Sequence, residues 1–414
     1  MDSDLKVLLT SSAFRKLLAA RLISNFGNGL APIALAFGVL DLPGASAQTL
    51  SIVMFAQMLP LVGFMLFGGV IADRYPKALM VGGSDIVLSI FVITNGVMFL
   101  TGTVSVQSLV IIGFISGILH ALWWPAMSAL TPEIVEEHQL QSANSAVGIS
   151  ANITYMLGTV TGGIVVAAIG SGWAIVLDGL SFLLAGLLVI QLRTFGLTRE
   201  KTPESPTVIQ DLREGWGEFK SRSWVVVIVL GYSIIAMLME SVFTVVGPAH
   251  AKAELGGPKP WSWVLASMTV GMLTAVAVTL KVRPRRPIFA GVLVQVLLGA
   301  WFVALGYSQW IPLLLIASVC AGFAMDFFMV LWQTTLQTQI PREALSRVSS
   351  YDAFGSLALA PFGIVISGPL VTHFGTTAVL RVFSIVFFIV LILMLLVPSV
   401  RSLANSELEH RTTD

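Results

Sequence analysis

The most constraining feature of the sequence is a short charged hairpin that joins two long apolar runs. The hairpin, Gly69–Lys77, reads GVIADRYPK, and it connects the runs Thr49–Ala72 and Ala78–Leu100. Since glycine permits close backbone approach and proline interrupts a continuous helix, the two runs are predicted to lie antiparallel to each other. Charges are costly in hydrocarbon, so the acid and the bases of the hairpin are expected at the water-exposed end of the pair.

A degenerate copy of this hairpin occurs about half a chain later, at Leu280–Pro287. When Pro76 is aligned with Pro284, Lys77 also aligns with Arg285. The sequence therefore predicts one six-helix unit that occurs twice in the chain.

The composition excludes several classes of protein. Of the 414 residues, 56% are hydrophobic and 11% are charged, which does not fit a water-soluble globule. The net charge of +1 and the lack of a basic patch give no sign of nucleic-acid binding. The single cysteine, Cys320, excludes disulfides and cysteine metal sites, and no cofactor or metal is expected. No cleavable signal pattern precedes the first apolar run, which is therefore expected to remain as a span.

Twelve apolar segments, each of about twenty residues, are long enough to cross a hydrocarbon core of roughly 30 Å. They predict an all-α integral membrane protein with twelve transmembrane helices in two pseudo-symmetric six-helix bundles. The predicted spans are 17–40, 49–72, 78–100, 107–130, 143–169, 173–192, 225–246, 263–280, 288–307, 311–333, 348–371 and 377–397. The corresponding domains are an N-terminal bundle at 1–192, a cytoplasmic linker at 193–223, a C-terminal bundle at 224–400 and a cytoplasmic tail at 401–414.

The linker and the loops carry most of the charge. Within the linker, the segment 209–224 places Leu212, Trp216 and Phe219 on one face, which is typical of an amphipathic helix lying on the membrane. Lysines and arginines concentrate at the N-terminus, in the loops after the even-numbered spans and in the tail. By the positive-inside rule, both termini are expected in the cytoplasm.

Several short motifs follow one another along the chain in a specific order. They are Ala72-Asp73-Arg74 with Lys77, Asp85, Trp124-Pro125-Ala126, Ala143-Asn144-Ser145, Leu157-Gly158 with Gly162-Gly163, Leu177-Asp178 with Ser181-Phe182, Leu212-Arg213-Glu214-Gly215, and Leu331-Trp332-Gln333-Thr334 with Arg347-Val348. On these motifs the chain resembles the major facilitator superfamily, and within it the twelve-span drug:proton antiporters that include macrolide-efflux proteins and enterobactin exporters. Two positions depart from that pattern. Thr159 stands where the fifth span usually has proline, and Lys281 stands where the first hairpin has Asp73.

The resemblance implies two bundles around a central cavity lined by spans one, four, seven and ten, which agrees with a binding site between repeats near the midplane. It also implies that Asp73 approaches the start of span eleven, around 347–350, when the inner side is closed. Small residues along span five suit sliding helices, although plain close packing explains them equally well. The gating motif comprises Gly69, Asp73, Arg74 and Lys77, and the antiporter-type helix carries Gly158, Gly162 and Gly163.

Polar residues in span one are candidates for the substrate cavity. Asn25 and Asn28 are three positions apart and share a helix face, where amides need partners in protein or water. They act either as interhelical hydrogen-bonding groups or as substrate contacts, and the sequence leaves both open. Arg21 lies a turn earlier, and a side chain that reaches back toward the cytoplasmic headgroups is favoured over one that lines the cavity.

Span four contributes His120, Trp123 and Trp124, of which the first and last share a helix face. A buried histidine is either a hydrogen-bonded structural residue or a group that titrates near neutral pH. Paired tryptophans belong either to the membrane interface or to an aromatic wall for flat or cationic ligands. All three residues are predicted to line the substrate cavity.

Span seven carries Glu240 and span ten carries Asp326. A carboxylate in hydrocarbon must find a cation, bind a proton or meet water. Both acids are therefore predicted to couple protons to transport, the alternative being a salt bridge to Arg21. Phe243 and Phe327, close to these acids, are expected to line the cavity.

Asp85 and Asp178 are secondary acids. Each is predicted near the start of its span, where the positive end of the helix dipole stabilises a carboxylate. This local explanation is favoured over a functional role.

Together these features favour a secondary active transporter, specifically a proton-coupled exporter of an amphiphilic drug, antibiotic or siderophore that works by alternating access. A uniporter or a proton-coupled importer of a small metabolite stays open, because direction depends on coupling and not on fold. An enzyme is disfavoured because no nucleophile–base pair, metal-ligand spacing or phosphate-binding loop is found, and a receptor because the outer loops are short. The expected partners are a small-molecule substrate, protons and the lipid bilayer, for a monomer in a bacterial cytoplasmic membrane.

Overall fold

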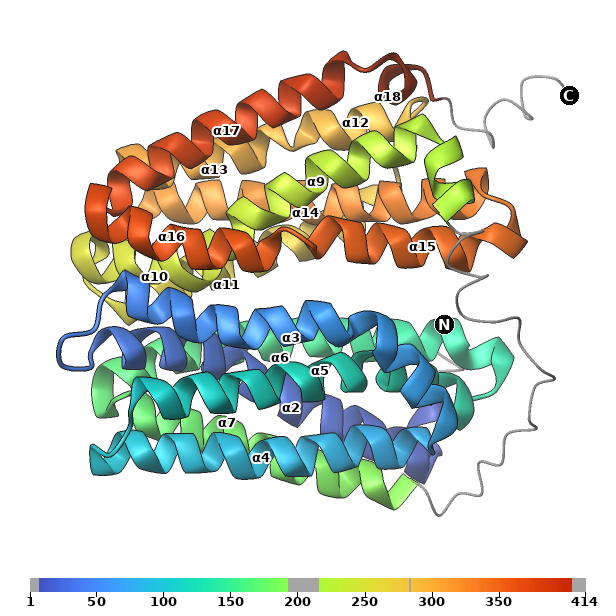
Figure 1. Cartoon of the computed structure of the whole chain (residues 1–414). Coiled ribbons are helices and arrows are strands. Elements are labelled where there is room, and N and C mark those ends of the chain that lie inside the picture. Colours follow the sequence, from blue (N-terminus) through green and yellow to red (C-terminus); the bar gives the residue numbers. More distant parts are fainter. Residues whose placement is uncertain (1–6, 193–215, 283, 404–414) are drawn as a thin grey trace, which may run out of the picture. The chain divides into compact units, whose positions relative to one another are not determined.

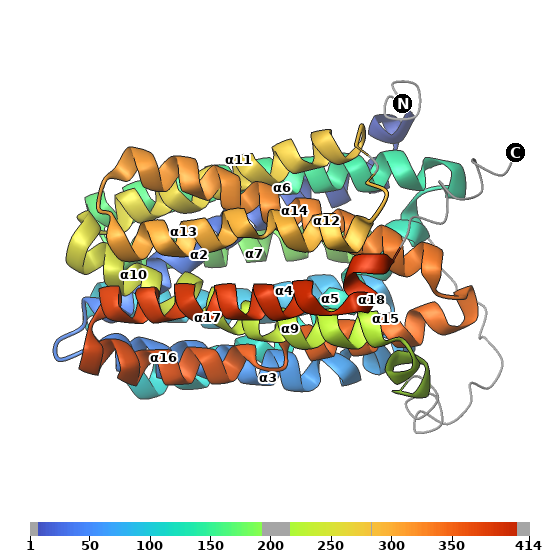
Figure 2. The ribbon, with the colours of Figure 1, turned by 90° about the horizontal axis from the view of Figure 1, so that it is seen from above.

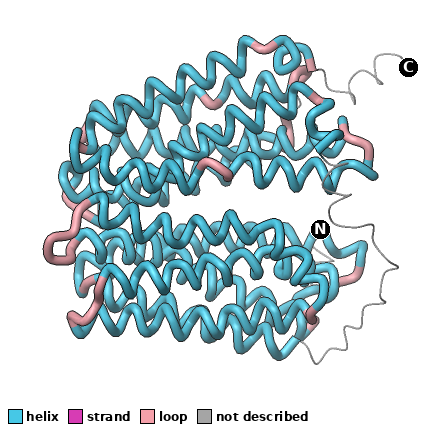
Figure 3. The backbone as a smooth tube through the Cα atoms, in the orientation of Figure 1, coloured by secondary structure: helices cyan, strands magenta, loops and turns pink. Residues whose placement is uncertain are grey.

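The computed structural model describes residues 7–192, 216–282 and 284–403, with the backbone alone at 66–74, 137, 342–343 and 346–347. Every regular element in these ranges is a helix (Figure 3). The chain divides into two units, and each is described by itself. The first unit comprises 1–200 and 251–263, and the second comprises 201–250 and 264–414.

The described residues of the first unit form six long helices (Figure 1). Within it α4 packs against α7, α3 packs against α5, and α2 packs against both α6 and α7. The helices are α2 (Ser12–Leu40), α3 (Ala47–Arg74), α4 (Lys77–Thr101), α5 (Val106–Ile134), α6 (Leu140–Ile169) and α7 (Ser171–Ile190).

The later helices are more interrupted. Two π-helical turns, η3 (Val242–Val246) and η4 (Ala251–Leu255), flank the short α10 (Gly247–His250). The segment 251–263 groups with the first unit, whereas the sequence-based division placed it in the C-terminal bundle. The other helices are α9 (Ser223–Ser241), α11 (Pro258–Thr279), α12 (Pro287–Val294), α13 (Val296–Tyr307), α14 (Ile311–Gln339), α15 (Arg342–Leu357), α16 (Ala360–Phe374), α17 (Thr376–Leu396) and α18 (Pro398–Ser402).

Twelve helices in the described residues are long and apolar enough to cross a membrane, which confirms the predicted number of spans. Besides span seven, in which η3 follows α9, two spans that the sequence predicts as continuous are each interrupted once. α12 and α13 lie in line as one span broken at Gln295, whose buried amide donates to the Ala324 carbonyl at 3.5 Å (Figure 2). α15 and α16 also form one span, and α16 begins at Ala360 with Pro361 in its first turn, which has no backbone N–H for the preceding turn.

Short turns set the antiparallel order of the spans. Ser46 and Ser105 each cap the following helix through a reciprocal capping box, which satisfies backbone N–H groups that the helix itself leaves unpaired. Gly102 and Gly170 have φ of 69° and 91°, a region that glycine adopts without steric cost. These local features allow successive spans to reverse direction within a few residues.

The first half of the predicted amphipathic linker helix, including Leu212, lies outside the described residues. Trp216 and Phe219 stack at 5.7 Å, and both rings contact Tyr351 of α15, at 5.6 and 5.8 Å. Since Phe219 is buried, this part of the linker packs against α15 within the second unit through its aromatic face.

Candidate functional site

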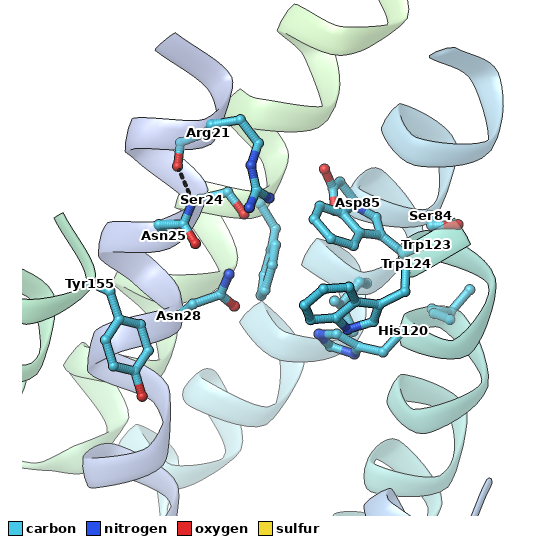
Figure 4. Close-up of a pocket in the computed structure, with 13 residues that line it drawn as sticks. Arg21, Ser24, Asn25, Asn28, Ser84, Asp85, His120, Trp123, Trp124 and Tyr155 are labelled. Carbon is cyan, nitrogen blue, oxygen red and sulfur yellow. Dashed lines mark hydrogen bonds between the residues drawn. The ribbon is translucent and has the colours of Figure 1, made fainter. Parts of the chain in front are cut away.

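A pocket of about 270 Å³ opens within the first unit (Figure 4). α2 presents polar side chains on one side of it, and α5 presents aromatic side chains on the other (Figure 4). The α2 residues are three and four positions apart, which places them on one helix face. The polar and aromatic lining residues are Arg21, Ser24, Asn25 and Asn28 from α2, Ser84 and Asp85 from α4, His120, Trp123 and Trp124 from α5, Tyr155 from α6 and Phe182 from α7.

Arg21 is the main charged group of this pocket. Its guanidinium carbon lies 4.9 Å from the centroid of the Trp123 ring, a cation–π contact. Asp85 lies within reach of the Arg21 charge but too far away for a direct ion pair. The expectation that Arg21 reaches toward the headgroups is wrong, because its side chain lines the pocket.

Neither asparagine forms an interhelical hydrogen bond with a described residue. The Asn25 amide donates to the backbone carbonyl of Arg21 at 2.7 Å, within its own helix. Asn28 makes no side-chain hydrogen bond in the described part of the chain, and both amides line the pocket. Both amides therefore lie at the pocket and neither bridges to a neighbouring helix in the described part of the chain.

His120 is fixed by its own helix. Its Nδ1 lies 2.8 Å from the Ser116 carbonyl, which can only accept, so Nδ1 carries the proton and Nε2 is left for another partner. The ring meets Phe182 edge-on at 6.3 Å. The Trp123 and Trp124 rings are nearly perpendicular with centroids 6.0 Å apart, and Trp124 is 63% exposed.

A second pocket, of about 530 Å³, lies within the second unit among α9, η3, α14 and α15. Glu240 and Phe243 line it, so the structure brings together two of the residues that the sequence singles out in span seven. Met239, Met325 and Met329 add flexible apolar side chains, which suit irregular ligands.

The Glu240 carboxyl group has no hydrogen bond or ion pair with any described residue, and the described lining of its pocket contains no Lys, Arg or His. The backbone around it is irregular, since α9 ends at Ser241 and the π-helical turn η3 follows at once. The Thr244 hydroxyl donates to the Glu240 carbonyl oxygen at 2.6 Å across this junction. Single π-helical turns inside α-helices frequently mark functional sites.

Stacked aromatic rings form one wall of the second pocket. Phe328 stacks on Tyr232 at 5.4 Å and on Trp332 at 6.2 Å, with interplanar angles of 13° and 12°. The Trp332 Nε1 donates to Asp352 at 2.9 Å, so a second acid is fixed in the lining. Asp352 was not singled out from the sequence, although an acid inside the apolar run 348–371 is the same signal that identified Glu240.

Residues 17–351 match the family model of the Major Facilitator Superfamily. The chain belongs to this superfamily. It is 24% identical over 402 residues to the multidrug efflux pump Tap of Mycolicibacterium fortuitum, covering 94% of this chain and 96% of that protein. It is 25% identical over 383 residues to the enterobactin exporter EntS of Citrobacter koseri, covering 88% of each.

Solved structures of low identity share the fold. A bacterial homologue of the human lysosomal transporter Spinster matches with a TM-score of 0.69 at 14% identity, over 94% of this chain and 98% of that one. A bacterial homologue of the iron transporter ferroportin matches with a TM-score of 0.70 at 15% identity, over 92% and 98%. The protein is therefore an integral multi-pass membrane transporter with the major facilitator fold, and not an enzyme.

The two secondary acids lie deeper in their helices than the sequence suggests. Asp85 and Asp178 are about two turns from the starts of α4 and α7, beyond the first turn over which the helix dipole acts. Asp85 lines the first pocket. Asp178 is buried against Gly27 of α2, where a Cβ atom would collide with its Oδ1, and that oxygen accepts no hydrogen bond from a described residue.

Asp326 and Phe327 are not among the described residues that line the second pocket. Asp326 is partly exposed and makes no hydrogen bond or ion pair within the described part of the chain. Phe327 is buried, stacks on Phe323 at 5.5 Å and packs with Ala275 and Leu331. Among the side chains that the structure describes, no three from His, Cys, Asp or Glu cluster as a metal site would require.

The gating motif is described only in part. Only the backbone of Gly69, Asp73 and Arg74 is described, at the end of α3. Lys77 is the first residue of α4 and is only 3% exposed, so the hairpin is not uniformly exposed to water.

The antiporter-type glycines are packing positions. Gly158 and Gly162 bring α6 against the α2 backbone at Phe26 and Leu30, and Gly163 faces Ser262. The three glycines therefore allow close contact between neighbouring helices of the first unit.

Proposed function

We propose that the protein exports an amphiphilic organic compound in exchange for protons, by alternating access, with both termini in the cytoplasm. The observation that carries this proposal is the Glu240 carboxyl group, which lines an apolar pocket and has no cation among the described residues around it. Such a group must bind a proton or meet water, and it can do each in turn as the site opens to one side and then to the other.

The pocket of Glu240 also suits an amphiphilic compound. Its wall of Tyr232, Phe328 and Trp332 offers flat apolar surface, and its methionines adapt to different shapes. Outward transport is supported by two relatives that cover most of this chain, a multidrug efflux pump and an enterobactin exporter. The distribution of lysines and arginines supports cytoplasmic termini.

Transport into liposomes tests the proposal. The purified full-length protein is reconstituted with an acidic lumen, and a panel of labelled amphiphiles is added outside. We expect protons to leave while at least one compound accumulates inside, above the level in protein-free liposomes. Accumulation that persists when an ionophore abolishes the pH gradient contradicts proton coupling and favours a uniporter.

Variants then identify the coupling acid. Glu240→Gln is expected to abolish accumulation driven by the pH gradient while it preserves exchange of labelled for unlabelled substrate, because only the proton site is lost. Asp326→Asn is the matched substitution at an acid that does not line the pocket, and we expect a smaller effect. If both single variants and the double variant still concentrate substrate, another group carries the proton.

A further inference from the structure

The pocket of the first unit gathers buried polar atoms that have no hydrogen-bond partner among the described residues. Arg21 Nε and Nη1, Ser24 Oγ and Trp123 Nε1 all belong to residues that line it. Every one of these atoms can donate a hydrogen bond. Asp85, the carboxylate in the described lining, interacts with Trp123 Nε1 outside strict hydrogen-bonding geometry, and it forms no direct ion pair with Arg21. The Arg21 nitrogens are therefore the charged donors that lack an acceptor in the described part of the chain.

Burying these donors costs free energy unless an acceptor forms hydrogen bonds with them. A guanidinium is always charged, and a buried charge without hydrogen-bonded partners is strongly disfavoured. Its planar set of donors matches the two oxygens of a carboxylate or phosphate. Arg21 is partly exposed as a whole, and Nη2 is the guanidinium nitrogen that is not among the buried atoms, so a group that enters the pocket can approach the guanidinium there.

We propose that this pocket binds an oxyanion group of the transported compound, such as a carboxylate, phenolate or phosphate, through the Arg21 guanidinium. The inference rests on the proposed transport function and names the charge of its substrate. Asn25 and Asn28, one turn further along α2, supply amide groups that can hydrogen-bond the polar atoms next to the oxyanion.

A bound cation fits this pocket less well. The Trp123 face that would attract a ligand cation is already occupied by Arg21, whose charge repels a second cation. The other pocket shows the opposite balance, since its described lining has Glu240 and Asp352 and no basic side chain. The aromatic wall that the sequence predicts from Trp123 and Trp124 is therefore assigned to the ring system of an anionic compound.

The Asp85 carboxylate is expected to weaken the binding of an anion in this pocket. It is buried and lies within reach of the Arg21 charge, so its carboxylate attracts the same guanidinium that a ligand oxyanion needs. An ionised Asp85 also repels the ligand. Neutralising this residue is therefore expected to strengthen the binding of an anion.

Three probes with one ring system test the inference: 1-naphthoate, its uncharged methyl ester and the cation 1-naphthylmethylammonium. Binding to the purified full-length protein in lipid nanodiscs is measured by calorimetry without any pH gradient. We expect naphthoate to bind more tightly than the other two probes. Arg21→Gln is expected to lower the affinity for naphthoate about ten- to hundredfold, because hydrogen bonds to a charged group are lost. The affinity for the ester is expected to stay unchanged. Lys252→Gln, which removes one positive charge outside the pocket, is the control and is expected to have no effect on the preference.

Two further variants keep the test decisive if Arg21→Gln does not fold. Arg21→Lys retains the charge without the planar donor set, and we expect an intermediate preference for naphthoate. Asp85→Asn is expected to raise the affinity for naphthoate several-fold and to leave the affinity for the ester unchanged. The inference is overturned if the wild type shows no preference for naphthoate over the ester, including no measurable binding of either, or if Asp85→Asn leaves naphthoate binding unchanged. The binding measurement applies no pH gradient, so it does not depend on whether the protein exports compounds in exchange for protons. In the same way, a failure of the binding test would not contradict proton-driven export in liposomes.

Discussion

Lys252 in η4 places its Nζ 2.7 Å from Asp41 Oδ1, an ion pair between residues 211 positions apart in the chain. The same ammonium group donates to the Leu40 carbonyl at the C-terminal end of α2, where a cation is also favoured by the helix dipole. The Lys252 and Asp41 side chains are 42% and 62% exposed, so the pair is expected to contribute modestly. It attaches the segment 251–263 to the first unit.

Loss of the ion pair between Lys252 and Asp41 is expected to make local opening of η4 more frequent. Lys252→Met removes both contacts, and hydrogen exchange of the amides at 251–255 is expected to become about two- to fivefold faster, in line with the small free energies of exposed ion pairs. Lys259→Met is the control, because Lys259 lies 5.4 Å over the Trp263 ring and does not contact Asp41. Equal acceleration in both variants would argue against the ion pair as the cause.

Substitution of two glycines of α6 by alanine is expected to change the stability of the protein in different ways. A Cβ on Gly158 would collide with the backbone carbonyl of Phe26 in α2, whereas Gly148 has open space around it. Gly158→Ala is expected to destabilise the protein by about 1–3 kcal/mol through overpacking. Gly148→Ala is expected to be neutral or slightly stabilising, since alanine favours a helix over glycine by about 0.8–1 kcal/mol. Thermal unfolding in detergent measures both, and similar midpoints would refute the close approach of α2 and α6.

Asp73 is expected to act as a gate, as its hairpin motif implies. Asp73→Asn is predicted to leave the folded fraction unchanged and to slow turnover about two- to fivefold, because a contact with a helix terminus contributes roughly 0.3–1 kcal/mol. Glu136→Gln is a suitable control, since Glu136 is an exposed loop acid whose side chain is 79% accessible. Turnover in liposomes equal to that of wild type would count against the gate.

The fold could be predicted because its determinants are local. A span is specified by the length and the apolar character of its own residues, so all twelve were found from the sequence. The interruption at Gln295 was missed because one polar residue breaks a helix only if a neighbour offers a partner, here the Ala324 carbonyl. The grouping of 251–263 with the first unit depends on contacts such as Lys252 with Asp41, which no local pattern contains.

The candidate site could be predicted only within single helices. Helical spacing placed Asn25 with Asn28 and His120 with Trp124, and the structure brings all four to one pocket. The proximity of Arg21 and Asp85 was missed, because it depends on how α2 and α4 are rotated toward each other. Asp352 was overlooked despite a visible signal, and its role became clear only from the bond with Trp332.

The bond between Trp332 and Asp352 is expected to stabilise the second unit. Trp332 Nε1 donates to Asp352 Oδ2 at 2.9 Å, and the Ser356 hydroxyl donates to Oδ1 at a longer 3.3 Å. Trp332→Phe keeps a ring in the stack but removes the donor, and it is expected to lower the free energy of unfolding by about 1–3 kcal/mol, because a buried carboxyl oxygen loses its partner. Trp224→Phe is the control, since Trp224 meets Trp332 edge-on at 5.6 Å and does not bond to Asp352.

Thermal unfolding of Trp332→Phe, Asp352→Asn and the double variant measures the coupling between the two residues. Strictly additive effects would show that this bond contributes nothing beyond the packing of the ring.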